Sequence, residues 1–455
     1  MQIQQGILNW PLGLARGSME NYRYSSWLIR NEISATKEVW LHGYTGAVDI
    51  IEKRYIESPS EEILSQMLGK GYLVKETLEE EKLHFLDIVK EIDDTKSTAN
   101  TYVVQFTIAC NFACAYCSEN STRRIKGYKN KRITLEYFDN INKIVSNFSE
   151  NTSEDKLILF GGEPLLVENY AEVERAIKLF NDQGMKELEV ITNGYNVDHF
   201  IDLFDDTDAV FQITLDGREN THDKRRIEKA TKHSYKTIIK NIQSLLSRKH
   251  TIYLRINVDH KNREDIPHLF DEFISYGFDQ NPSFKPYLGY THDYGKYDNK
   301  STTNDLYEYF VGFDSIEKFN ISRDPFDLEK SLEHSINNDV PFEFKSAHCG
   351  ANKGNMLMFA PDGKIHACWD SSPNDKEIGT YYPEIRWNTD SYQKEWLNRT
   401  ISSLTVCQNC KYALFCAGGC QYMAKNETGN YYSPHCNGYQ NVFNDVLVCI
   451  ARELL

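Results

Sequence analysis

The sequence lacks a long hydrophobic run, and no apolar stretch approaches the roughly 18 residues needed to cross a bilayer. The first residues contain no basic region that leads into an uninterrupted apolar stretch, so we expect no secretion signal. Positive charge is also scarce, because 51 Lys and Arg residues face 66 Asp and Glu residues, a net charge of −15. Nucleic acids and anionic lipids need a basic face. We therefore expect a cytoplasmic protein with no nucleic-acid partner and no membrane partner.

Cysteine is absent from the first 109 residues and again between positions 118 and 348. The eleven cysteines therefore lie in two dense groups, at 110–117 and at 349–449. A secreted domain stapled by disulfides would be shorter and would carry a signal. In a chain of 455 residues, with 40% hydrophobic and 26% charged residues, the two groups indicate metal binding within folded cores. The length suggests about three domains.

Residues 1–97 are predicted to form an N-terminal winged-helix-like module. The segments YRYSSWLIR and KEVWLHGY read as strands. The segment SPSEEILSQMLGKGYLVKE carries helix start and stop signals and then a short strand, and EEEKLHFLDIVKEI repeats apolar residues at helical spacing. A purely structural N-terminal cap is the alternative interpretation.

Residues 98–290 alternate between strand and helix patterns. Six buried strands are predicted, in TYVVQFTI, KLILF, ELEVIT, AVFQITL, TIYLRINV and SFKPYL. Helical segments between them imply parallel pairing with right-handed crossovers. Six units predict an α/β fold, a partial (β/α)6 TIM-like barrel with its active site at the carboxyl ends of the strands. Residues 291–345 are expected to be a connector, and residues 346–455 a cysteine-rich domain.

The first cysteine group is Cys110, Cys114 and Cys117, directly after the first predicted barrel strand in CNFACAYC. Three cysteines at C-x3-C-x2-C spacing can hold one face of an iron–sulfur cube and leave the fourth iron without a protein thiolate. A zinc site would favour two C-x2-C pairs or added histidines. The motif resembles the cluster motif of the radical S-adenosylmethionine (SAM) superfamily.

The resemblance extends to GGEP at the end of the second predicted strand, which comprises Gly161, Gly162, Glu163 and Pro164. Glycines permit a tight turn and close approach of the backbone to a ligand. The resemblance implies that this segment contacts the amino group of SAM.

It also implies [4Fe-4S] clusters and SAM as cofactors, and a flavodoxin- or ferredoxin-type reductant. The reduced cluster would cleave SAM to a 5′-deoxyadenosyl radical that abstracts hydrogen from an unactivated carbon.

Other polar residues near the strand ends are weaker candidates for contact with SAM. The resemblance points to Thr214 and to Arg225 or Arg226. Arg255 and Asn257, on the fifth predicted strand, are similar candidates. Strand caps and solvated charges are the alternative interpretation of these residues.

The second cysteine group reads C-x2-C-x5-C-x3-C from position 407, with single cysteines before and after it. This order resembles the SPASM extension of radical SAM enzymes that modify peptides and proteins. The resemblance implies two auxiliary [4Fe-4S] clusters. It assigns to the outer cluster Cys407, Cys410, Cys416 and Cys436. It assigns to the inner cluster Cys349, Cys368 and Cys420.

Seven cysteines leave two four-iron clusters one ligand short of eight. Cys449 is the only spare, and its place in an apolar helical pattern predicts a core thiol. His348, His366 and Asp370 are the other candidates for the eighth ligand. If none fills the position, a substrate thiolate could bind the open iron, which makes a thioether the leading product.

The resemblance implies a maturase that installs a crosslink in a ribosomally synthesised precursor peptide. The N-terminal module would bind the precursor's leader as an added β-strand. Thioether, carbon–carbon and carbon–oxygen crosslinks and epimerisation all start from the same radical.

Two alternatives remain. An anaerobic sulfatase-maturating type of enzyme would form formylglycine on a protein Cys or Ser, but its usual extra cysteine is missing from GANKGNMLM after Cys349. An iron–sulfur electron carrier would explain the cysteines but not the barrel with GGEP.

Overall fold

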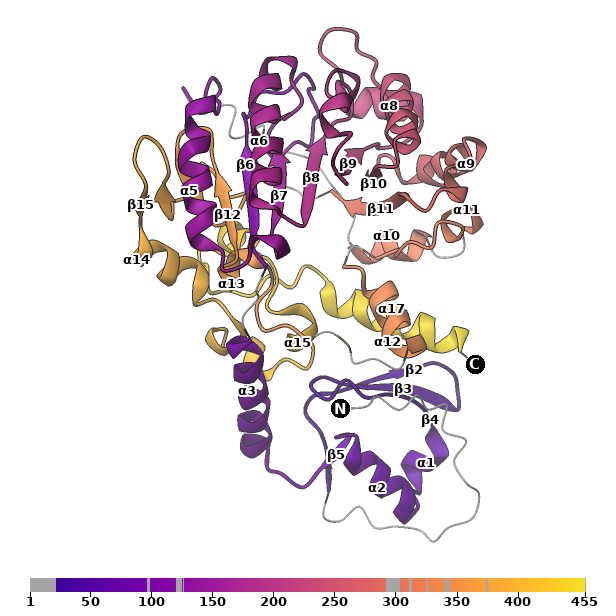
Figure 1. Ribbon diagram of the computed structural model, residues 1–455. Helices are drawn as coiled ribbons and strands as arrows, with labels where there is room; N and C mark the ends of the chain where they lie inside the picture. Colours follow the sequence, from indigo (N-terminus) through magenta and orange to yellow (C-terminus); the bar gives the residue numbers. More distant parts are fainter. Residues whose placement is uncertain are drawn as a thin grey trace. The chain divides into compact units, whose positions relative to one another are not determined.

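The computed structural model describes residues 22–95, 99–119, 125, 127–291, 303–310, 313–324, 326–338, 342, 344–373 and 375–454. The chain forms two compact units (Figure 1). The first unit comprises 1–96, 326–349 and 399–455, and the second comprises 97–325 and 350–398. Two sequence predictions fall on other residues: the absence of a secretion signal concerns residues 1–21, and the connector includes residues 292–302. Both stretches lie outside the described residues.

The second unit is built on six parallel strands that neighbour one another in chain order, from β6 to β11. They are β6 (Thr101–Gln105), β7 (Lys156–Phe160), β8 (Glu187–Thr192), β9 (Val210–Thr214), β10 (Thr251–Val258) and β11 (Phe284–Tyr290). Five fall within a segment predicted as a strand, and β11 extends two residues beyond the predicted segment at 283–288. The predicted α/β partial barrel is therefore confirmed.

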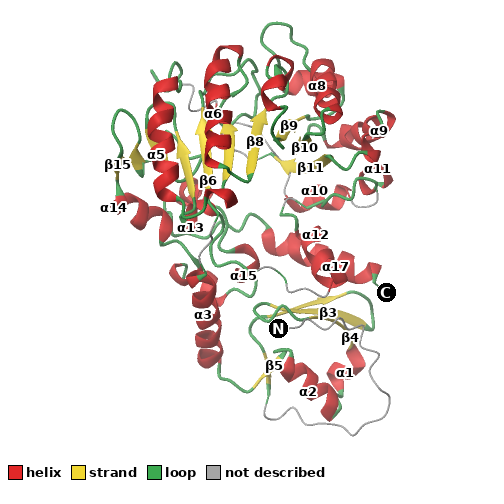
Figure 2. Cartoon of the chain, in the orientation of Figure 1, coloured by secondary structure: helices red, strands yellow, loops and turns green. Residues whose placement is uncertain are grey.

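Amphipathic helices cover one face of these strands (Figure 2). The long ones are α5 (Phe138–Phe148), α6 (Tyr170–Gln183), α8 (Tyr235–Ser247) and α9 (Ile266–Ser275). The shorter ones are α7 (Glu219–Arg225), α10 (Thr303–Phe310) and α11 (Asp314–Glu317). Ile213 on β9 and Ile238 on α8 both approach Gly194, so Ile213 faces the helices. Because side chains alternate along a strand, Gln212 and Thr214 face the opposite side.

The sheet also continues beyond β6, which the sequence did not predict. Strand β12 (Met356–Phe359) pairs parallel with β6. Three short antiparallel strands follow, β13 (Lys364–His366), β14 (Gly379–Thr380) and β15 (Arg386–Trp387), with helices α13 (Gly350–Lys353) and α14 (Thr389–Ser391) nearby in the chain. A strand of four residues is too short for alternation of apolar and polar residues to identify it from the sequence. It forms because the edge of β6 offers unpaired backbone groups.

The first unit contains an antiparallel sheet in the order β2-β3-β4. Its strands are β2 (Leu28–Glu32), β3 (Lys37–His42) and β4 (Val48–Glu52), and a separate ribbon pairs β1 (Arg23–Tyr24) with β5 (Leu73–Val74). The helices are α1 (Lys53–Glu57), α2 (Glu61–Gly69), α3 (Leu78–Asp94), α12 (Leu328–Asn338), α15 (Ala413–Cys416), α16 (Gln421–Thr428) and α17 (Tyr439–Glu453). The structure has strands or helices in each segment predicted for this region, although YRYSSWLIR holds two strands, β1 and β2, and β4, α1, α15 and α16 are additions. The four consecutive domains remain a prediction.

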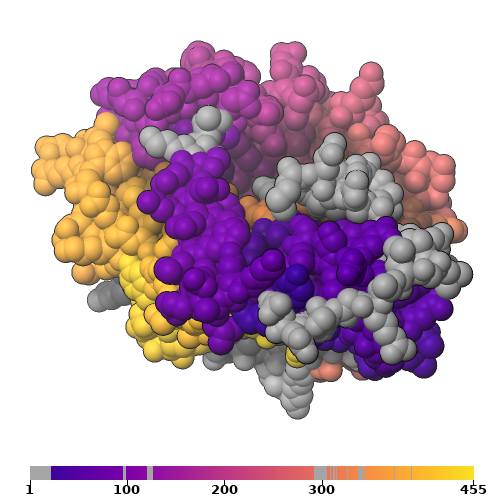
Figure 3. Space-filling model, turned by 90° about the horizontal axis from the view of Figure 1, so that it is seen from below, coloured from indigo at the N-terminus to yellow at the C-terminus, as the bar shows by residue number. Residues whose placement is uncertain are grey.

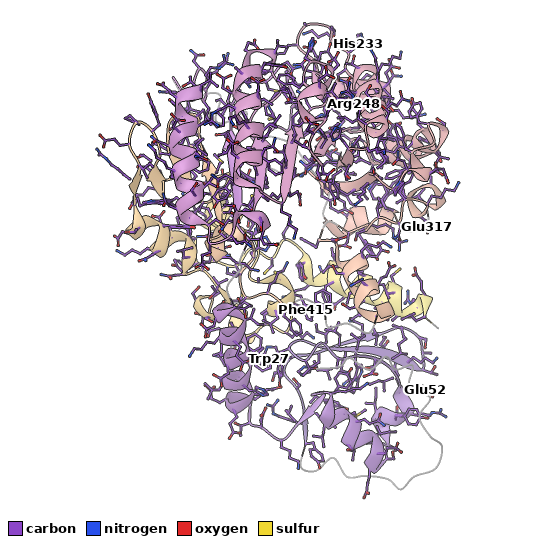
Figure 4. All side chains as sticks on the ribbon, in the orientation of Figure 1. Trp27, Glu52, His233, Arg248, Glu317 and Phe415 are labelled. Carbon is purple, nitrogen blue, oxygen red and sulfur yellow. The ribbon has the colours of Figure 1, made fainter. Side chains whose placement is uncertain are left out.

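The N-terminal segment shares a core with the C-terminal cysteine segment. Trp27 stacks on Phe85 of α3 with ring centroids 4.9 Å apart. Both belong to a buried cluster that includes Ile401, Leu404 and Leu414. The space-filling view shows residues of the two segments side by side (Figure 3), and Trp27 and Phe415 mark them in Figure 4. Within the described residues, no helix is long and apolar enough to cross a membrane.

Phe85→Ala is expected to lower the free energy of unfolding by about 3–5 kcal/mol, because it opens a cavity in this shared core. Leu83→Ala on the same helix is the matched control, since Leu83 is 55% exposed. Urea denaturation followed by tryptophan fluorescence measures both. Equal effects of the two substitutions would show that α3 does not join the segments through Phe85.

Candidate functional site

The first cysteine group lies in the loop that follows β6, at the carboxyl end of the sheet. Backbone hydrogen bonds tie this loop to the end of β7. The N–H of Gly162 donates to the carbonyl of Thr107 at 2.7 Å, and the N–H of Glu163 donates to the carbonyl of Ala109 at 2.9 Å. The position of the cysteine loop is thus set by the GGEP segment.

Gly161 and Gly162 are required by this pairing. Gly161 has a φ of +145°, and a Cβ there would lie 2.4 Å from the Thr107 carbonyl oxygen. A Cβ at Gly162 would lie 2.3 Å from the Ile108 carbonyl oxygen. The two glycines therefore allow the backbone after β7 to approach the cysteine loop closely. Contact of GGEP with SAM stays a prediction.

The carboxylate of Glu163 is buried and joins the ends of β7 and β8. It accepts hydrogen bonds from the Thr192 hydroxyl at 2.7 Å, the Asn193 N–H at 2.7 Å and the Leu165 N–H at 2.9 Å. Burial raises the pKa of Glu163, while these hydrogen bonds act in the opposite direction. Its side chain is therefore a brace for the strand ends.

The thiols of the first group have surroundings that suit thiolate ligands. The Cys110 sulfur lies 3.3 Å from the Phe112 N–H donor and 3.7 Å from the Asn193 side-chain nitrogen. Burial raises the pKa of the Cys114 thiol to about 12, whereas the positive charge of Arg226 lowers it. The thiols of Cys110 and Cys117 also raise that pKa, so the three are electrostatic neighbours. N–H donors and a buried cation are what an iron–sulfur cluster needs from its surroundings.

Within the described residues, no three His, Cys, Asp or Glu side chains stand close enough together to hold a single metal ion. Cysteines on a four-iron cube bind different iron atoms and are spaced more widely than the ligands of one ion. The surroundings of the two cysteine groups therefore suit iron–sulfur clusters, and ligation of clusters by these cysteines stays a prediction.

Tyr116, between the second and third cysteines of the motif, organises polar groups from the segment after β9, from β10 and from the end of α7. Its hydroxyl donates to the buried carboxylate of Asp216 after β9. The same oxygen accepts from Arg226 at 2.8 Å and from Asn257 of β10 at 3.2 Å. The motif tyrosine thus fixes the arginine that faces the Cys114 thiol.

Arg225 forms ion pairs with two buried carboxylates. Its guanidinium lies 3.3 Å from Asp216 and 2.9 Å from Asp259. Its side chain is only 10% exposed, and both carboxylates are fully buried. This pairing gives Arg225 a structural role, and the predicted contact with SAM stays a prediction.

The face of the sheet opposite the helices carries Thr214 and Arg255, which pair across β9 and β10. Arg255 donates to Asn257 at 2.8 Å, and a Cβ at Gly289 would lie 2.8 Å from the Arg255 Nε, so the glycine leaves room for it. Burial raises the pKa of Asp370 to about 6, and the charge of Arg255 opposes this rise. The sequence proposed Asp370 only as a cluster ligand and gave no signal for its approach to Arg255.

Six of the seven predicted auxiliary-cluster cysteines belong to the first unit. Burial raises the pKa of Cys407 to about 12, and the neighbouring thiols of Cys410, Cys416 and Cys436 raise it further. The four cysteines assigned to the outer cluster by resemblance are therefore electrostatic neighbours. Cys368 lies in the second unit.

The candidates for the eighth ligand differ in their surroundings. The His348 Nδ1 lies 3.2 Å from the Cys416 carbonyl oxygen, and burial lowers the pKa of His348 to about 4. His366 is buried, and neither ring nitrogen has a hydrogen-bond partner among the described residues. Cys449 is partly exposed, with its sulfur 3.8 Å from a Glu453 carboxylate oxygen. The prediction of a core thiol at 449 is wrong, because that position turns away from the buried stripe of α17.

Gly162→Ala is expected to remove about four of the iron atoms of the reconstituted protein, the content of one cluster, since the added methyl group would displace the cysteine loop. Gly184→Ala is the matched control. Gly184 also has a positive φ, +60°, but nothing lies within 4 Å of the added carbon. Its left-handed backbone costs about 1–2 kcal/mol without disturbing the site. Iron and sulfide analysis of both variants measures the effect. Unchanged iron content in Gly162→Ala would show that the contact between Gly162 and the cysteine loop does not position the cluster ligands.

Comparisons with known proteins agree with this geometry. The family model of the radical SAM superfamily matches residues 104–273. The cysteine-type anaerobic sulfatase-maturating enzyme of Clostridium novyi is 23% identical over 75% of this chain and 89% of its own length. The solved structure of native anSMEcpe with bound AdoMet and Cp18Cys peptide is 16% identical and covers 78% of this chain and 100% of its own, with a TM-score of 0.57.

A second solved structure resembles a larger part of the chain. Streptococcus suis SuiB bound to precursor peptide SuiA is 12% identical and covers 91% of this chain and 99% of its own, with a TM-score of 0.51. Likeness at this identity concerns the fold. The family match shows that residues 104–273 of this chain form a radical SAM domain.

Proposed function

We propose that this radical SAM enzyme is a maturase that installs a crosslink in a ribosomally synthesised precursor peptide. The observation that carries the proposal is the second cysteine group, because six of its seven proposed cluster ligands belong to the first unit, whereas the radical SAM domain belongs to the second. Auxiliary clusters there would serve a substrate larger than a metabolite, as the resemblance to the SPASM extension implies.

The two cysteine groups and GGEP would hold the cofactors. Cys110, Cys114 and Cys117 would hold the first cluster, with Asn193 and Arg226 supporting the thiolates. Bound SAM and the reduced cluster supply a radical that abstracts hydrogen from an unactivated carbon. Thr214 and Arg255, on the face of the sheet opposite the helices, offer hydrogen-bonding groups that would orient the peptide.

The leader would add to the edge of β4. Within the described residues, β4 pairs with β3 alone. Val48 and Ile50 on β4 are half-buried, although their partners on β3 are fully buried. The other edge strand, β2, is approached by the C-terminal segment, since the Lys411 amine lies 3.4 Å from the Leu28 carbonyl oxygen. An added strand gains backbone hydrogen bonds at a free edge, and adjacent apolar side chains supply specificity.

A second candidate is formylglycine formation on a protein Cys or Ser. The similarity to the Clostridium novyi sulfatase-maturating enzyme, which covers most of both chains, favours it. The two candidates share the radical SAM chemistry and differ in the product. The finer proposal, that the crosslink is a thioether, rests on the count of seven cysteines for two clusters.

Mass spectrometry of the precursor encoded beside the gene tests the function. We expect a product that has lost two hydrogens and whose cysteine no longer reacts with an alkylating reagent. The Cys110→Ala, Cys114→Ala, Cys117→Ala variant is the control and should yield neither product nor 5′-deoxyadenosine. A product in which every cysteine still alkylates would exclude the thioether. Formylglycine on a co-expressed sulfatase, with the precursor unmodified, would establish the second candidate.

Ile50→Asp is expected to weaken binding of the precursor by about tenfold, or ~1.4 kcal/mol, because it places a charge beside the β4 edge. SAM cleavage with dithionite should be unchanged. Ser34→Asp is the matched control, because it adds the same charge to the exposed turn between β2 and β3. Fluorescence anisotropy with a labelled precursor measures both. Equal affinities for the two variants would exclude β4 as the leader-binding edge.

A further inference from the structure

Arg399 is a fully buried cation in the first unit. Its guanidinium donates to four backbone carbonyls, those of Gly418 at 3.0 Å, Gly419 at 2.9 Å, Tyr431 at 2.6 Å and Ser433 at 2.8 Å. Among the described residues, no carboxylate forms an ion pair with it. Burial of a charge is unfavourable unless an opposite charge compensates for it. The carbonyl dipoles satisfy its hydrogen bonds but carry no net charge.

The carbonyls that Arg399 binds belong to the loops that carry three cysteines. Ala417, Gly418 and Gly419 all have positive φ, +53°, +77° and +71°, and they form the turn between Cys416 and Cys420. Tyr431 and Ser433 lie on the segment that leads to Cys436. One side chain therefore fixes both loops.

The Cys407 thiol lies near the same guanidinium. A Cβ at Gly418 would lie 3.6 Å from the Cys407 sulfur and 3.8 Å from the Arg399 Nη1, so these two groups flank one point. Burial lowers the pKa of Arg399, and four cysteines oppose this by raising it. These cysteines are Cys407, Cys420, Cys349 and Cys416. By resemblance, two belong to the outer cluster and two to the inner cluster.

We propose that Arg399 is the shared internal counter-cation of the two auxiliary clusters and the positioning residue for the loops that carry their cysteines. This inference rests on the proposed ligation of those clusters. Net charge and hydrogen bonding around an iron–sulfur cluster set its reduction potential. A nearby positive charge stabilises the reduced, more negative cluster, so Arg399 would raise the potential of both clusters and keep them competent to accept an electron from the substrate.

The test uses the full chain with Cys110, Cys114 and Cys117 replaced by Ala, so that only the auxiliary clusters contribute. Arg399→Met removes the charge and the hydrogen bonds, whereas Arg399→Lys keeps the charge and loses the planar fork. Arg452→Met is the matched control, since Arg452 makes one hydrogen bond to the Ile33 carbonyl, at 3.3 Å. Iron analysis and a redox titration followed by electron paramagnetic resonance are the readouts.

We expect about eight iron atoms in the parent, and midpoint potentials of both clusters that shift to more negative values in Arg399→Met, less in Arg399→Lys and not in Arg452→Met. If Arg399→Met loses its iron, retention of iron by Arg399→Lys supports the role of the charge.

Unchanged potentials in Arg399→Met, a shift confined to one cluster, or equal effects of the Met and Lys variants on potential or iron would overturn the proposal. A parent without iron would instead refute the auxiliary clusters themselves.

Discussion

Buried positive charge beside buried thiols is the constraint on which both cysteine-bearing regions depend. The chain carries a net charge of −15, and burial raises the pKa of Cys114 in the first cysteine group and of Cys407 in the second. A nearby cation, N–H donors and a bound metal all favour the thiolate form in such places. Arg226 is such a cation beside Cys114, and Arg399 lies among the cysteines of the first unit. In each case hydrogen bonds fix the arginine.

In the radical SAM domain, the candidate site forms where hydrogen bonds connect the carboxyl ends of the parallel strands. GGEP after β7 holds the cysteine loop after β6, and Glu163 joins the same region to the end of β8. Tyr116 then connects the loop to groups after β9 and on β10. The first two connections run between adjacent parallel strands, whereas Tyr116 reaches from the loop after β6 to β9 and β10, which are not adjacent to β6.

The first unit brings together segments that lie at opposite ends of the chain. Helix α3 packs through Phe85 and Val89 against residues 401–414, which carry the start of the outer cysteine group. The region proposed to bind the leader and most of the region proposed to hold auxiliary clusters therefore belong to one compact unit. Changes that destabilise one would disturb the other, which is why single substitutions at an edge test the leader hypothesis better than a deletion.

The sequence by itself determined the features that local patterns specify. Strand and helix periods placed β6 to β11 and the helices between them, and cysteine spacing with GGEP identified the superfamily. Tertiary structure decided what depends on distant partners. Strand β12 exists because β6 offers an edge, Cys449 turns away from the core, and Arg399 reaches carbonyls up to 34 positions away. Local periodicity cannot encode such contacts, because the residues that make them meet only after the chain has folded.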